Sequence, residues 1–176
     1  MTSPRTAERP MAFTAWEFIR GALLTYVYFL PLTIIPFLVM FAGGILHPDR
    51  IGGIVEDPEV LLGTLSLWAF MLLPSATWGA AALVPAALVA LGIGLGLRRN
   101  PRRGVHALAH GAWGLGVGVL VAGLVMGAWS FGGDAIGLLP TVLGFGVAVG
   151  LAAALAWWTT AALALRRDAR APQVSG

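Results

Sequence analysis

Two histidines have the types and spacing that could do chemistry in this chain. His106 and His110 are four residues apart, so on a helix they share one face. Two imidazoles can begin a metal site, but such a site needs a third or fourth ligand. The chain has no Cys, and the acids that could complete such a site follow no metal-binding spacing: Glu8, Glu17 and Asp168. Two interpretations stay open. The histidines are a pair of metal ligands, or they lie at a membrane–water interface beside Arg102 and Arg103.

No other part of the sequence has the pattern of an active site. It contains no G-x-S-x-G, no H-E-x-x-H and no phosphate-binding loop with Lys. We therefore predict that the chain is not an enzyme and carries no cofactor. A small channel or transporter protomer is an alternative, and it requires a polar cavity lined by hydroxyl-bearing residues: Tyr26, Tyr28, Thr33, Ser75, Thr77 and Thr159.

The elements that must position these residues are membrane helices. Of the 176 residues, 58% are hydrophobic and 11% are charged, and the mean hydropathy is +0.84. Soluble domains have about 25% charged residues. A soluble protein of this size could not cover its surface with so few charges, and a disordered chain would be far less apolar. The composition predicts an integral membrane protein.

The apolar stretches predict an all-α, polytopic membrane helix bundle with four transmembrane helices. About 20 apolar residues cross the hydrocarbon, and the predicted spans are 22–45, 78–97, 105–130 and 136–165. These form one bundle over 22–165. Residues 1–21 are predicted to be a cytoplasmic segment with a short interfacial helix, and 166–176 a cytoplasmic tail.

A fifth, shorter apolar segment precedes the second span. Pro74-Ser75 divides the long stretch 61–97, and Pro58 suits the first position of a helix. We predict a short apolar interfacial or re-entrant helix over 58–73. Whether this segment crosses the membrane stays open.

The arginines predict how the chain is threaded. With four crossings, ten of the eleven arginines fall on the side of both termini and Arg50 alone on the other. The positive-inside rule then places the N- and C-termini in the cytoplasm and the protein in the plasma (inner) membrane. The same clusters attract anionic lipid headgroups, and we predict no nucleic-acid binding. The main determinants of topology are Arg98, Arg99, Arg102, Arg103, Arg166 and Arg167.

Small residues at four-residue spacing predict the helix-packing faces, because membrane helices associate where their backbones approach closely. We expect the last three spans to pack tightly, and the first span, which has bulky aromatics and two prolines, to lie outside them. An exposed glycine face could instead join two copies of the chain. The packing positions are Ala82, Ala86, Ala90, Gly94, Gly114, Gly118, Gly123, Gly127, Gly144, Ala148 and Ala152, with a second stripe at Gly146, Gly150 and Ala154.

The predicted spans contain no Asp, Glu, Lys or Arg. Proton relays and ion-coupled carriers usually need such groups, so their absence disfavours a pump. The sequence favours a non-enzymatic structural or accessory subunit, with a membrane-protein partner or a second copy of itself. The alternatives are a channel or transporter protomer, and a metal-binding membrane protein that uses His106 and His110.

Overall fold

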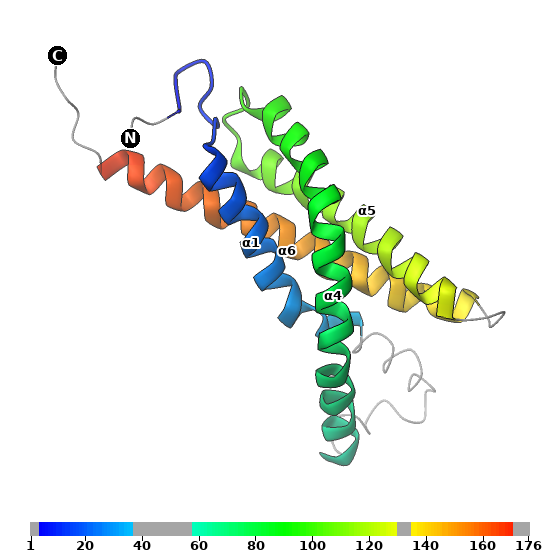
Figure 1. The fold of residues 1–176 in the computed structure, drawn as a ribbon. Coiled ribbons are helices and arrows are strands. Elements are labelled where there is room, and N and C mark those ends of the chain that lie inside the picture. The colour runs from blue at the N-terminus through cyan, green and yellow to red at the C-terminus, as the bar shows by residue number, and fades with distance from the viewer. Residues whose placement is uncertain (1–3, 37–57, 130–134, 171–176) are drawn as a thin grey trace.

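The computed structural model describes residues 4–36, 58–129 and 135–170, which fold into four helices (Figure 1). Each helix is long and apolar enough to cross a membrane. The prediction of an all-helical membrane bundle with four spans is confirmed. The helices are α1 (Ala15–Leu32), α4 (Pro58–Leu97), α5 (Arg103–Trp129) and α6 (Ala135–Arg170).

Helix α1 begins at a capping box. The Thr14 hydroxyl accepts a hydrogen bond from the Glu17 backbone N–H (3.1 Å), and the Glu17 carboxylate accepts one from the Thr14 N–H (3.0 Å). The helix continues from there into the apolar stretch, so the interfacial helix expected before residue 22 is instead the first part of α1. A break in apolar surroundings would leave backbone groups unpaired. Residues 37–45 of the predicted first span lie outside the described residues.

Helix α4 is a single helix of 40 residues, about 60 Å long at 1.5 Å per residue. It begins at Pro58 as expected, but the structure differs from the prediction at Pro74, because residues 58–73 are continuous with 78–97. The Thr77 hydroxyl donates a hydrogen bond to the Leu73 carbonyl (3.0 Å) just after the proline. A proline removes one backbone hydrogen bond, whereas ending the helix in an apolar phase would leave several groups unpaired.

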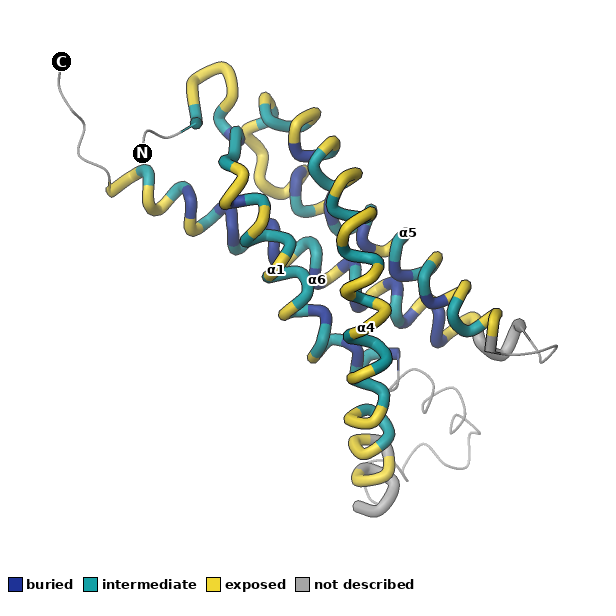
Figure 2. Tube along the Cα trace, in the orientation of Figure 1, coloured by how far each residue is buried: buried dark blue, intermediate teal, exposed yellow. Residues whose placement is uncertain are grey.

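The helices pack in an order that the sequence did not indicate. The most extensive contact joins α5 and α6, and α1 packs along α6. Helix α4 makes smaller contacts with α5 and α1, and its Pro58 half projects away from the other helices (Figure 1). Figure 2 shows that α4 is exposed or half-buried along nearly its whole described length. The peripheral helix is therefore α4, and the expectation that the first span lies outside is wrong.

Glycines bring the backbones of α5 and α6 together. A Cβ added at Gly118 would lie 2.8 Å from the Gly146 Cα, and one added at Gly114 would lie 2.9 Å from the Val149 carbonyl oxygen. At Gly150 an added Cβ would lie 2.9 Å from the Gly111 carbonyl oxygen. Helix α5 therefore packs on the α6 stripe that contains Gly146 and Gly150.

The other α6 stripe, which begins at Gly144, faces α1. Gly144 lies against Pro36 at one end, and Thr160 lies against Gly21 at the other. Between these ends, three alanines are completely buried: Ala148, Ala152 and Ala156. The two small-residue stripes of α6 thus serve two different helices, which explains why α6 is the most buried helix.

The remaining predicted packing residues do not all make helix contacts. A Cβ added at Gly123 or Gly127 would meet nothing within 4 Å in the described structure. Gly94 lies under the Phe13 ring of the N-terminal segment. The three alanines of α4 line a cavity: Ala82, Ala86 and Ala90.

Candidate functional site

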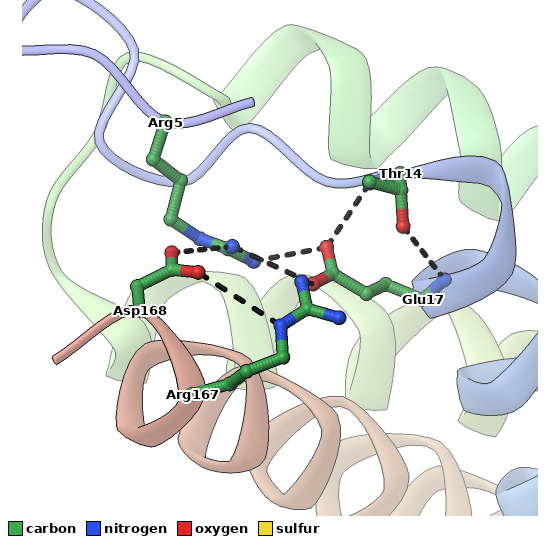
Figure 3. Close-up of polar contacts among 5 residues, drawn as sticks. All are labelled: Arg5, Thr14, Glu17, Arg167 and Asp168. Carbon is green, nitrogen blue, oxygen red and sulfur yellow. Dashed lines mark hydrogen bonds and ion pairs between the residues drawn. The ribbon is translucent and has the colours of Figure 1, made fainter. Parts of the chain in front are cut away.

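A cluster of four charged side chains joins the N-terminal segment to α1 and α6 (Figure 3). The Glu17 carboxylate is at its centre, with only 1% of its side chain exposed. Arg5 donates to Glu17 (3.0 Å) and to Asp168 (2.9 Å), and Arg167 donates to Glu17 (2.9 Å). Two arginines therefore balance two carboxylates, as a buried charge requires.

This cluster lies at the arginine-rich end of the molecule, where it holds the N-terminal segment against α1 and α6. The Met11 N–H also donates a hydrogen bond to the Arg98 carbonyl (3.2 Å), which ties the N-terminal segment to the end of α4. Of the predicted topology determinants, Arg167 belongs to the cluster. The others are exposed or half-buried: Arg98, Arg99, Arg102, Arg103 and Arg166.

The two histidines lie inside the bundle and stack on a tryptophan from another helix. The ring of Trp157 on α6 lies 4.3 Å from His110 and 5.5 Å from His106, measured between centroids, and the rings are nearly parallel. His106 is fully buried and His110 is 6% exposed. Helical spacing predicts the shared face of the histidines but not the contact with Trp157, which follows 47 residues after His110.

Each imidazole makes a hydrogen bond to a backbone carbonyl. His106 Nε2 lies 2.9 Å from the backbone carbonyl oxygen of Asn100, and His110 Nδ1 lies 2.8 Å from the backbone carbonyl oxygen of His106. The other nitrogen of each ring, Nδ1 of His106 and Nε2 of His110, is buried without a hydrogen-bond partner. Among the described residues, no three potential ligands gather to hold a metal ion. Metal binding by this pair stays a prediction.

A long cavity of about 580 Å³ lies between α4 and the other three helices. Its wall on α4 extends from Leu67 to Ala90, and its wall on α5 from His110 to Met126. Most of the lining is aliphatic or glycine, and the largest side chains are aromatic: Phe18, Tyr26, Phe29, Trp78, Trp113, Phe145 and Trp157.

Hydrogen bonds from aromatic side chains attach α4 to the other helices across the cavity. Tyr26 of α1 donates to the Ala76 carbonyl (3.1 Å), and Trp113 of α5 donates to the Ala86 carbonyl (3.0 Å). Further along, Trp68 of α4 donates to the Thr33 hydroxyl (3.0 Å). Large side chains that reach to the α4 backbone keep the helix attached and also keep it apart from α5 and α6.

The polar residues expected to line a channel are not brought together. Tyr26 and Ser75 line the cavity. Tyr28 instead lies 3.4 Å from Thr159, hydroxyl to hydroxyl, beside α6. The hydroxyls of Thr33 and Thr77 bond to carbonyls of their own chain segments. The cavity therefore has an apolar wall with few hydroxyls.

The arrangement suits binding of an apolar molecule, since an apolar cavity with a few polar groups is typical of ligand sites. Comparison with known proteins adds no relative: no protein family, curated protein or solved structure matches the chain.

Proposed function

We propose that the chain is a non-enzymatic accessory protein of the plasma membrane that binds a hydrophobic molecule between its helices. The observation that carries the proposal is the cavity of about 580 Å³ with its aliphatic and aromatic wall. Ligand sites typically measure about 300–1,000 Å³ and are mostly apolar, and in helical bundles they lie between the helices. An apolar wall supports a hydrophobic ligand over an ion, because an ion needs polar groups to replace its hydration.

The attachment of α4 supports the same proposal. Two hydrogen bonds, from Tyr26 and Trp113, join α4 to its neighbours beside the cavity. Helices α5 and α6 are in direct backbone contact. A ligand can therefore enter from the bilayer beside the loosely packed α4 while α5 and α6 form a fixed wall.

A cavity-filling substitution tests the proposal. Ala82→Phe places a phenyl ring in the cavity, whereas Ala81→Phe places the same ring on the exposed face of α4. A ring in the path of the ligand is expected to cost about 1.4 kcal/mol, so that affinity falls about tenfold. The measurement is photolabelling of the protein in lipid nanodiscs by a diazirine derivative of hexadecanol, followed by peptide mapping.

The native protein and Ala81→Phe should be labelled equally on cavity residues, and Ala82→Phe about tenfold less. Labels confined to outward-facing residues, or equal labelling of the two variants, would contradict the proposal.

The proposed orientation has a test of its own. The positive-inside rule predicts that a reporter fused after Asn100 is cytoplasmic and one fused after Ile136 lies on the outer side. Alkaline phosphatase should therefore be active only at Ile136, and green fluorescent protein fluorescent only at Asn100. Phosphatase activity at Asn100 would reverse the proposed placement of both termini.

A further inference from the structure

The hydrogen bond of His110 decides which of its nitrogens is left as a hydrogen-bond acceptor. Nδ1 lies 2.8 Å from the His106 carbonyl oxygen. A carbonyl oxygen can only accept, so Nδ1 carries the hydrogen of the neutral ring and Nε2 carries the lone pair. The parallel Trp157 ring, 4.3 Å away, fixes the plane of the imidazole. His110 therefore presents a hydrogen-bond acceptor in a fixed direction.

This acceptor is unsatisfied within the protein. Nε2 is buried without a hydrogen-bond partner, and His110 is part of the cavity wall. The Ala90 carbonyl of α4 also lies near the ring, but a carbonyl is itself an acceptor and cannot pair with a lone pair. A buried polar atom without a partner is unfavourable, so a ligand that brings a donor gains more here than one that does not.

His110 lies at one end of the cavity. The lining residues nearest the arginine-rich end of the molecule are Phe18 on α1, Ala90 on α4, His110 on α5 and Trp157 on α6. From His110 the wall continues along α5 to Met126, sixteen residues further, which is about 24 Å at 1.5 Å per residue. The site therefore combines a polar atom at one end with a long apolar body.

From this geometry we infer that the ligand is a chain molecule with a terminal O–H group, which donates a hydrogen bond to His110 Nε2. A long-chain alcohol and a protonated fatty acid share this chemistry. The inference rests on the proposed function, since it names the ligand of the same cavity. The alkyl chain lies along α4 and α5 in the direction of Met126.

A pair of probes that differ only in the donor tests the inference. Hexadecanol and hexadecyl methyl ether compete with the diazirine probe for the native protein in nanodiscs. Hexadecanol is expected to bind about tenfold more tightly, because the ether leaves Nε2 unpaired. In His110→Phe a planar ring keeps the stack on Trp157 but removes the acceptor, so both probes should bind with the weaker affinity.

His106→Phe is the matched control. His106 stacks on the same tryptophan but is not part of the cavity wall. This variant should keep the preference for hexadecanol. Palmitic acid distinguishes the two candidate ligands, the long-chain alcohol and the protonated fatty acid. Its binding is measured below and above the pKa of its carboxyl group in the bilayer. A fatty-acid ligand binds more tightly than the alcohol when protonated and loses this advantage when ionised.

The outcomes separate the two proposals. Equal affinity of hexadecanol and its methyl ether for the native protein would overturn the donor inference and leave the hydrophobic cavity site standing. Loss of the preference in His106→Phe but not in His110→Phe would also overturn it. Failure of both probes to compete for the native cavity would overturn the proposed function itself.

Discussion

Replacing Glu17 by alanine is expected to lower the free energy of unfolding by about 3–5 kcal/mol, the range found when one member of a buried ion pair is removed. The Glu17 side chain is 1% exposed and pairs with Arg5, which is itself only 11% exposed. Without the carboxylate, a largely buried guanidinium loses one of its two counter-charges. Arg167 contributes less, because its side chain is 58% exposed and water screens it.

The loss at Glu17 also removes half of the capping box that begins α1. Glu17→Gln separates the two effects, because glutamine can keep the hydrogen bond from the Thr14 N–H but not the charge. We expect a smaller loss for glutamine than for alanine. The measurement is an unfolding titration with sodium dodecyl sulfate in mixed micelles, followed by far-UV circular dichroism.

An exposed acid in the same segment supplies the control. Glu8→Ala should change the free energy of unfolding by no more than about 0.5 kcal/mol, as exposed substitutions usually do. Trypsin should cleave after Arg5 faster in Glu17→Ala than in Glu8→Ala, because the N-terminal segment is no longer held to α6. Equal stability and equal cleavage in the two variants would show that the cluster does not fasten this segment.

The sequence predicted the spans well because hydropathy is a local property. Any stretch of about 20 apolar residues must be a helix in the bilayer, whatever surrounds it. The pattern Thr14-x-x-Glu17 is also a local signal for the start of a helix. The ion pairs of Glu17 are not local, since Arg167 is 150 residues away and meets it only when α6 folds back along α1.

The order of packing could not be predicted from small residues alone. Alanines and glycines allow two helices to approach closely, but they do not require it. On α6 both stripes are used, by α5 and by α1. On α4 the corresponding alanines face the cavity, because Tyr26 and Trp113 reach across to the α4 backbone and hold it away.

The histidine site was predicted in part. Helical spacing places His106 and His110 on one face of α5, and the structure shows both rings parallel to Trp157. Trp157 has no spacing relationship to them, because it comes from a helix that the connection after α5 brings back. The unpaired Nε2 of His110 depends on this packing, and no sequence pattern encodes it.

Replacing Gly150 by valine is expected to lower the free energy of unfolding by about 3 kcal/mol, the upper part of the range for overpacking. A Cβ at Gly150 would lie 2.9 Å from the Gly111 carbonyl oxygen and 3.3 Å from the Leu115 backbone nitrogen. These are backbone atoms, which cannot turn aside as a side chain can, so α5 and α6 must separate. The same detergent titration measures the loss.

Gly116→Val is the matched control for Gly150→Val, because a Cβ at Gly116 would meet nothing within 4 Å in the described structure. It introduces the same side chain into the other helix of the pair, on a face that meets no helix, and should leave stability nearly unchanged. If the two variants were equally stable, the close backbone contact would not be what holds α5 to α6. The fixed wall of the cavity depends on that contact, so Gly150→Val should also weaken hexadecanol binding, although Gly150 does not line the cavity.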